Sequence, residues 1–472
     1  MDASVRFDQT LLALESEHTV HAMLELVAPP APDTDRPSLH VALVIDRSGS
    51  MAGPKLEAAK RAGVFLAERL GGDDELAVVT YDDDVALEVP LTTPDGDVRR
   101  TIAAIHPGGM TNLSGGWLKG LEEAQRSGED GVRRVLLLSD GLANVGITDP
   151  EQLAGLAGNA RDTVGTTTIG FGEGFDEDLL AAMADAGGGS TYFAETPEDA
   201  PGIFAEEFEG LSSVVAQNVS VEIHTSEDVK LLGVLNEYPI DDTPDGPQVQ
   251  LGDAYGGEKR RVVCKFHVPN VAALGPCTLA EFVLRYVSVG EQVSAHTVTL
   301  PLVVNVVNAD EAAEQEPDQV VHEEVLLLEA AKARQEAIDL ADRGDLDGAA
   351  LRMESVHGLL SMADPDSERV KEFAEEAEQL QEHALSMRSG VYSAVQRKKM
   401  RVEEYRRRKG QVRSWGLSLV GTTKLSGALM RSVGFIVAPF DDTAAGPKTS
   451  FVGSSPPLRS APGTGFERYW LQ

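Results

Sequence analysis

Four short runs of almost entirely apolar residues, separated by helical patterns, constrain the fold of this chain more than any other feature. They cover residues 39–45, 76–81, 134–138 and 166–171. A strand that is apolar at consecutive positions must be covered on both faces, as in a parallel sheet. The segments between the runs, such as residues 55–70 and 113–126, repeat apolar side chains at helical spacing. The alternation predicts an α/β domain with a doubly wound, mainly parallel sheet.

On both sides of this domain the apolar pattern has a period of two. Residues 4–28 contain two such stretches, and five more follow a helix predicted at residues 197–215. The five cover residues 219–223, 229–235, 261–268, 278–288 and 296–306. Repeated short strands of this kind are typical of an antiparallel β-sandwich. Because the strands before residue 28 are too few for a domain of their own, we expect them to join the sandwich. The α/β domain would then be inserted in the sandwich or lie next to it.

The remainder of the chain has a helical character. A polar, acidic linker at residues 309–318 precedes a predicted hairpin of two helices, 323–343 and 346–361, and a third helix that begins near residue 364 and runs to about 409. From about residue 442 the chain is rich in Pro, Gly and Ser, which predicts disorder. The predicted organisation is 1–37 (strands of the sandwich), 38–215 (α/β domain), 216–308 (sandwich), 319–412 (helical region) and 413–472 (C-terminal segment).

The charge of the chain restricts its partners. The net charge is −35 over 472 residues, which argues against non-specific binding of nucleic acid because phosphate backbones require basic patches. No stretch reaches the roughly 18 uncharged apolar residues of a membrane helix, and the N-terminus does not resemble a secretory signal. Only two cysteines are present, Cys264 and Cys277, which we interpret as reduced thiols, with a single bridge as the alternative. We therefore expect a cytoplasmic protein that does not bind membranes.

Oxygen-bearing side chains gather where the apolar strands end. Asp46, Ser48 and Ser50 follow the first run, Asp140 follows the third, and Thr111 lies in a Gly-rich loop ahead of a helix. The carboxyl ends of parallel strands are where sites form in such sheets. Carboxylate and hydroxyl oxygens are hard ligands, suited to Mg²⁺, Ca²⁺ or Mn²⁺. The sequence therefore predicts a site for a divalent cation, with Mg²⁺ as the favoured ion.

These motifs resemble the metal-ion-dependent adhesion site of the von Willebrand factor A (VWA) family, which combines DxSxS, a loop Thr and a strand-end Asp. The chain is most similar to a bacterial subgroup that resembles calcium-activated chloride channel regulators and the inter-alpha-trypsin inhibitor heavy chain. The resemblance implies that Ser48, Ser50 and Thr111 bind the metal directly. It implies that Asp46 and Asp140 supply charge, directly or through water, and that one coordination position stays open for a carboxylate of the ligand.

The resemblance implies a non-enzymatic, metal-dependent protein-binding module, such as an adaptor or scaffold that binds an acidic group of a protein partner. Two alternatives stay open at this point. The chain could be an accessory subunit of an ATPase machine; because it has no ATPase motif of its own, the AAA+ ATPase would be a separate protein. It could also be a metal-dependent hydrolase. The hydrolase is disfavoured because the sequence places no general base near the site.

One segment reverses the charge of the chain. Residues 397–413 contain nine basic residues and two acidic ones. Two interpretations compete: a docking surface for an acidic partner, and a solvated helix end whose cations are favoured by the helix dipole. We favour the solvated helix end because no aromatic or motif context marks a nucleic-acid site.

Overall fold

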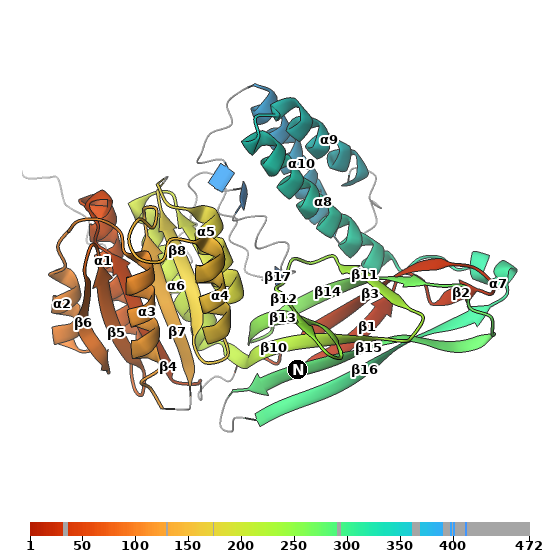
Figure 1. Cartoon of the computed structure of the whole chain (residues 1–472), viewed down its shortest axis with the longest axis horizontal. Helices are drawn as coiled ribbons and strands as arrows, with labels where there is room; N and C mark the ends of the chain where they lie inside the picture. Colours follow the sequence, from red (N-terminus) through yellow and green to blue (C-terminus); the bar gives the residue numbers. More distant parts are fainter. Residues whose placement is uncertain are drawn as a thin grey trace, which may run out of the picture. The chain divides into compact units, whose positions relative to one another are not determined.

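The computed structural model describes residues 1–31, 36–128, 131–172, 174–289, 294–360, 369–389, 397–398, 400–401 and 411–412 (Figure 1). The C-terminal segment, including the stretch predicted to be disordered, therefore lies outside the described residues. Among the described helices, none has both the length and the apolar content that crossing a bilayer requires.

A six-stranded sheet forms the centre of the α/β domain. Its order is β6 (Val85–Thr92), β5 (Glu75–Tyr81), β4 (Leu39–Asp46), β7 (Val132–Ser139), β8 (Gly165–Phe171) and β9 (Gly188–Ala194). Neighbouring strands are parallel except β5 and β6, which are antiparallel. The central strand β4 is buried at every position, which explains its continuous apolar run. The predicted mainly parallel sheet is confirmed.

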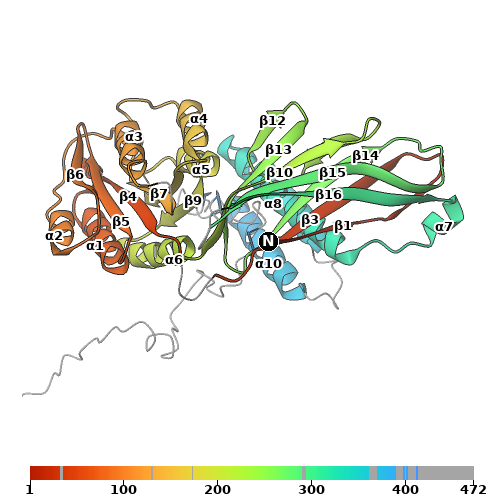
Figure 2. The same ribbon diagram turned by 90° about the horizontal axis from the view of Figure 1, so that it is seen from below.

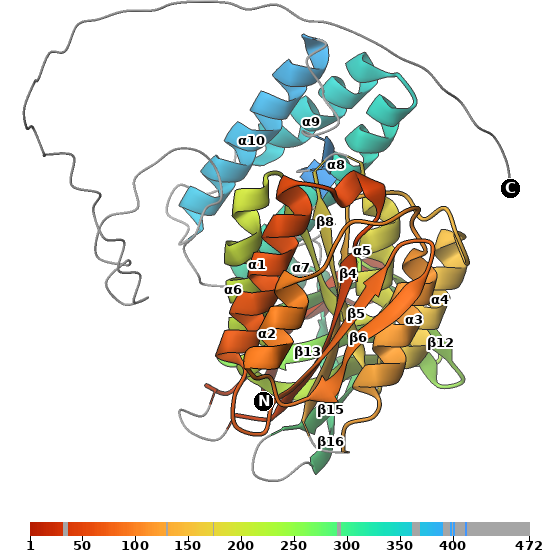
Figure 3. The same ribbon diagram turned by 90° about the vertical axis from the view of Figure 1, so that its left-hand side faces the viewer.

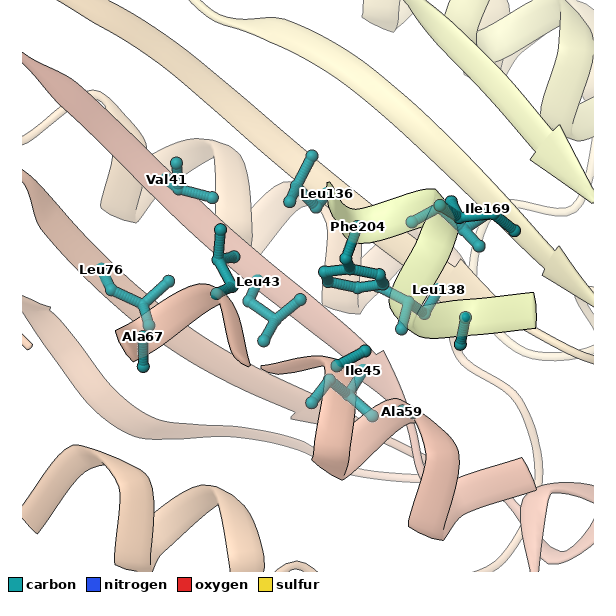
Figure 4. Packing of buried hydrophobic residues seen from close by; sticks show 14 of the residues in the cluster. Val41, Leu43, Ile45, Ala59, Ala67, Leu76, Leu136, Leu138, Ile169 and Phe204 are labelled. Carbon is teal, nitrogen blue, oxygen red and sulfur yellow. The ribbon is translucent and has the colours of Figure 1, made fainter. Parts of the chain in front are cut away.

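Helices cover both faces of this sheet (Figure 3). One face packs against α1 (Pro54–Arg69), α2 (Gly96–Ala103) and α6 (Ala200–Ser212), and the other against α3 (Leu113–Ala124), α4 (Pro150–Ala160) and α5 (Glu177–Ala186). Alternate side chains of β4 point to opposite faces of the sheet. Leu43 and Ile45 pack in one core with Phe204 of α6 (Figure 4), whereas Val44 packs in the other core with Trp117 of α3. The central strand β4 therefore packs against both layers of helices.

The sandwich contains two sheets around one apolar core (Figure 2). The first sheet has the order β1 (Asp2–Phe7), β3 (His18–Val27), β14 (Lys259–Val268) and β11 (Lys230–Val234), with β17 (Gln411–Val412) also paired to β14. The second has the order β12 (Ile240–Thr243), β13 (Gly246–Tyr255), β10 (Val214–Thr225), β15 (Gly275–Ser288), β16 (Ser294–Val307) and β2 (Leu11–Ala13). The chain enters the α/β domain from β3 and leaves it into β10, so the α/β domain is inserted in the sandwich.

The helical region begins after a short helix, α7 (Ala309–Ala313), which replaces part of the predicted linker. It consists of α8 (Gln319–Asp342), α9 (Leu346–Leu360) and α10 (Val370–Arg388), which share an apolar core. The turn between α8 and α9 contains Gly344 in the left-handed region at φ 86°, a conformation that glycine adopts without steric cost. Asp345 then accepts a hydrogen bond from the backbone N–H of Gly348 at 2.8 Å, as expected of an N-cap.

Other details also differ from the sequence predictions. The helix predicted at 197–215 is shorter: α6 ends at Ser212, and Val214 and Val215 begin β10. Both valines are buried, and β-branched side chains favour the extended chain when a sheet partner is available. The hairpin of β12 and β13 was not predicted. Its first strand is exposed at three of four positions, so it lacks the apolar alternation by which strands are recognised.

Candidate metal site

The five predicted ligands lie at the carboxyl edge of the central sheet. Asp46 is the last residue of β4, and Asp140 follows the end of β7. Because β4 and β7 are parallel neighbours, the two carboxylates come to the same edge. Ser48 and Ser50 lie in the turn after β4, which includes a short 3-10 helix, η1 (Gly49–Met51).

Hydrogen bonds connect the carboxylates and the two serines. The backbone N–H of Ser48 donates to Asp46 Oδ1 at 2.8 Å. The hydroxyls of Ser48 and Ser50 are 3.1 Å apart, and the Ser50 hydroxyl donates to Asp140 Oδ1 at 2.7 Å. The DxSxS turn and the strand-end Asp, which are far apart in the sequence, therefore form one polar cluster.

Thr111 completes the cluster from a third loop. Its backbone N–H donates to Asn144 Oδ1 at 2.9 Å, and its carbonyl accepts from the backbone N–H of Asn144 at 3.2 Å. A Cβ built on Gly141 would lie 3.5 Å from Thr111 Oγ1 and 3.6 Å from Ser50 Oγ. The two hydroxyls therefore face the same glycine, and the structure brings all five predicted residues together.

Glycine backbones join the loops around the site. The N–H of Gly49 donates to the carbonyl of Gly109 at 2.8 Å, and the N–H of Gly108 donates to the carbonyl of Arg47 at 2.6 Å. A Cβ on Gly108 would lie 1.6 Å from Asp82 Oδ2, a clash that excludes any larger residue at this position without rearrangement. Glycine at this position lets the Thr111 loop approach the DxSxS turn.

Asp82 helps to hold these loops together and is not one of the five predicted ligands. Its carboxylate accepts from the backbone N–H groups of Gly109 and Asp84 at 3.2 and 3.0 Å, and pairs with Arg47 at 3.2 Å. Burial alone would raise the pKa of Asp82, but these backbone donors and the Arg47 guanidinium together lower it. The Asp82 carboxylate is thus ionised and engaged by the chain itself.

Two further side chains contact the predicted ligands and were not themselves predicted. The Lys55 ammonium, in the first turn of α1, donates to Asp140 Oδ2 at 2.5 Å. The Ser139 hydroxyl donates to Asp46 Oδ2 at 3.0 Å. Ser139 adjoins Asp140 in the sequence and could have been suspected, whereas Lys55 has no spacing motif that relates it to Asp140.

The site concentrates buried negative charge. Asp46 and Asp140 are 0% and 1% exposed, while Ser50 is exposed. Burial raises the pKa of Asp46, and the nearby Asp140 carboxylate adds to the increase, although hydrogen bonds from Ser48 and Ser139 oppose it. Neutral donors make the described hydrogen bonds to Asp46. A cluster made only of oxygen donors, with two buried carboxylates, has the chemistry that a hard divalent cation requires.

Comparisons with known proteins identify the domain that holds this site. Residues 41–142 match the family described as the von Willebrand factor type A domain. An uncharacterized protein of Synechocystis, sll0103, is 28% identical over 343 residues, which are 70% of this chain and 80% of that protein. The human inter-alpha-trypsin inhibitor heavy chain H3 is 33% identical over 160 residues, which are 31% of this chain and 18% of the relative.

Solved structures share the fold over a larger part of the chain. A structure described as von Willebrand factor type A from Catenulispora acidiphila has a TM-score of 0.65 at 18% identity and covers 88% of this chain and 97% of its own. The chain thus spans most of the Synechocystis protein and of the Catenulispora structure but a small part of the inter-alpha-trypsin inhibitor heavy chain. Together with the family match and the sheet topology, these similarities show that the chain carries a von Willebrand factor type A domain.

Proposed function

We propose that this protein is a non-enzymatic adaptor or scaffold that binds an acidic group of a protein partner through a divalent cation at the VWA domain. The observation that carries the proposal is the convergence of Asp46, Ser48, Ser50, Thr111 and Asp140 from three loops. Two of these residues are buried carboxylates, and Ser50 is exposed. The cluster is therefore both negatively charged and open to a ligand.

The five residues have different roles in this proposal. The hydroxyls of Ser48, Ser50 and Thr111 would bind the cation directly, and Asp46 and Asp140 would supply negative charge, directly or through water. When bound, the cation supplies positive charge and an open coordination position for a carboxylate of the partner. Mg²⁺ is the favoured ion because all the donors are hard oxygens, and Ca²⁺ or Mn²⁺ would fit the same donors.

Exposed apolar side chains next to the site indicate what else the partner presents. Met110 precedes Thr111 and is 50% exposed, and Leu142 follows Asp140 by two residues and is 58% exposed. Their loops lie together, since the N–H of Asn144 donates to the carbonyl of Thr111. Large exposed apolar residues beside a polar centre are typical of protein interfaces. We infer that the partner offers an aliphatic or aromatic contact beside its carboxylate.

Calorimetry with Mg²⁺ on the purified chain tests the metal site. We expect one Mg²⁺ per chain in the wild type and no measurable binding in Asp46→Ala, with the circular dichroism spectrum unchanged. Asp83→Ala, which removes an exposed carboxylate near the site but outside the five donors, is the matched control and should bind as the wild type does. Equal Mg²⁺ affinity in wild type and Asp46→Ala would contradict the proposal.

Affinity capture tests the dependence of partner binding on the cation. The wild type in Mg²⁺ should retain a protein that is released by a chelator and is not retained by Thr111→Ala. A partner held equally by the wild type, by Thr111→Ala and in the presence of chelator would show that binding does not use this site.

A further inference from the structure

The basic segment that follows α10 contains a buried lysine. Lys398 is 4% exposed, and its ammonium donates to the carbonyl of Phe175 at 2.5 Å and pairs with Glu177. The same ammonium lies 4.0 Å from the centre of the Phe175 ring, close enough for a cation–π interaction. A lysine is rarely buried unless it is paired. Lys398 is therefore not part of a solvated helix end, and the sequence-based interpretation of this position is wrong.

Two arginines beside it contact an acidic surface, which we define as Glu177 and Asp178 of α5 with Asp339 and Asp342 of α8. Arg397 pairs with Glu177, with Asp342 at 2.7 Å and with Asp178 at 3.5 Å. Arg401 pairs with Asp339 at 3.3 Å and with Asp178 and Asp342 at 3.5 Å. Three cations thus meet four carboxylates. The acidic partner of this segment is the chain itself.

The segment also belongs to the helical region. Met400 is 1% exposed and packs in the core that α8, α9 and α10 share. Lys398 contacts the VWA domain from the same stretch of chain. This part of the chain is therefore anchored in the helical core by Met400 and in the VWA domain by Lys398.

The contacted part of the VWA domain lies directly behind the metal site. A Cβ on Gly174 would lie 2.7 Å from the carbonyl oxygen of Asp140, and a Cβ on Gly172 would lie 3.3 Å from Cε of Lys55. Both glycines belong to the loop between β8 and α5 that also contains Phe175. A shift of this loop cannot leave Asp140 and Lys55 unaffected, because close-packed groups transmit displacement.

We propose that residues 397–398 and 400–401 form an intramolecular clamp whose docking site is the acidic surface. We further propose that the docked clamp fixes the loop behind Asp140, so that docking of the clamp and binding of the cation favour each other. The segment that occupies the surface is basic. Its buried Lys398 lies between Arg397 and Arg401, and both arginines pair with carboxylates. The linkage to the cation rests on the proposed function, whereas the clamp itself does not. Linkage between two sites is reciprocal, so release of the clamp must weaken the binding of the cation.

Hydrogen exchange without any added cation tests the clamp in the full-length chain. Lys398→Met keeps the apolar stem and removes the charge, and Lys371→Met, at an exposed position of α10, is the matched control. We expect the amides of residues 174–180 to exchange about fivefold faster or more in Lys398→Met than in the control. Equal exchange in the two variants would overturn the clamp. If Lys398→Met does not fold by circular dichroism, Arg397→Gln takes its place with the same expectation.

Calorimetry with Mn²⁺ on the same variants tests the linkage. We expect binding about tenfold weaker in Lys398→Met than in Lys371→Met, within the usual range of coupling between sites. Faster exchange with unchanged Mn²⁺ affinity would overturn the linkage. If Mn²⁺ binds to none of the proteins, including the wild type, the proposed function and the linkage fail together, and the exchange measurement still decides whether the clamp exists.

Discussion

The two edges of the central VWA sheet each bury an aspartate, and the chain treats the two carboxylates in opposite ways. At the amino edge, Asp74 is 1% exposed and accepts two hydrogen bonds from Arg36, at 2.8 and 2.5 Å. It also accepts from the backbone N–H groups of Leu39 and Gly71, both at 2.9 Å. At the carboxyl edge, the Asp46 carboxylate is equally buried, but its hydrogen bonds come from Ser48 and Ser139, which carry no charge.

The pKa directions show the consequence of this difference. Burial would raise the pKa of Asp74, but Arg36 and the two backbone donors lower it overall. The pKa of Asp46 is raised, because burial outweighs its hydrogen bonds. A buried charge that the chain neutralises contributes to stability. A buried charge that the chain leaves uncompensated is available for an external cation, which supports the proposal that the carboxyl edge is functional and the amino edge structural.

The largest expected effect is on the amino edge. Asp74→Ala leaves the Arg36 guanidinium and the N–H groups of Leu39 and Gly71 without their acceptor, and should reduce the free energy of unfolding by about 2–4 kcal/mol. Denaturant unfolding measures this loss. The Mg²⁺ affinity of the folded variant should equal that of the wild type. A stable Asp74→Ala chain with impaired Mg²⁺ binding would reverse the assignment of the two edges.

The carboxyl edge should show the converse behaviour. Asp46→Asn keeps the shape of the side chain and removes its charge, so the stability of the cation-free chain should change by less than about 1 kcal/mol. Mg²⁺ at about 100 times its Kd should stabilise the wild type by about 2.7 kcal/mol and should not stabilise Asp46→Asn. Thermal unfolding with and without Mg²⁺ makes the comparison. A similar Mg²⁺ effect in both proteins argues against Asp46 as a ligand.

Acid should remove the contribution of Asp74. A carboxylate whose pKa is lowered in the folded chain stabilises it above the ordinary aspartate pKa, and that stabilisation is lost as the pH falls through the folded value. The difference in unfolding free energy between the wild type and Asp74→Asn should therefore be largest above about pH 5 and shrink below about pH 4. Urea unfolding at several pH values measures it. A difference that does not change with pH would mean that the charge of Asp74 contributes nothing.

The smallest expected effect concerns Lys55, which already places a positive charge on Asp140. An external cation competes with this ammonium, so Lys55→Met should bind Mg²⁺ about threefold to tenfold more tightly, equivalent to about 1 kcal/mol. Lys230→Met removes the same charge from an exposed position of β11 in the sandwich and should leave the affinity unchanged. Weaker binding in Lys55→Met would indicate that Lys55 supports the site instead of competing with the cation.

Local pattern and strand order were sufficient to predict much of this molecule. The runs that became β4 and β7 are apolar because both faces of each strand are covered, and their parallel order alone brings Asp46 and Asp140 to one edge. The edge strand β6 was not predicted, although Val85, Leu87, Val89 and Leu91 alternate with other residues, because Pro90 lies within the run and a proline argues against a regular strand.

Contacts that depend on side-chain reach could not be predicted. Nothing in the sequence relates Lys55 to Asp140, or Lys398 to Glu177, because each pair is joined only by the packing of separate elements. The ion pair of Arg36 and Asp74 could not be predicted for the same reason. Strand order thus predicts which side chains lie at the ends of strands, but it does not predict which cationic side chains neutralise the acidic groups.

The insertion of the VWA domain between β3 and β10 has a consequence for how the chain is made. β3 pairs along its whole length with β14, so that Val20 lies opposite Phe266, about 250 residues later. During synthesis β3 cannot pair until β14 has been made. The inserted domain consists of strand–helix–strand units that are close in the sequence, so it can fold first. Once folded, that domain holds its two ends together and shortens the loop that β3 and β14 must close. The domain proposed to bind the partner protein would thus also act as the template on which its own sandwich is assembled.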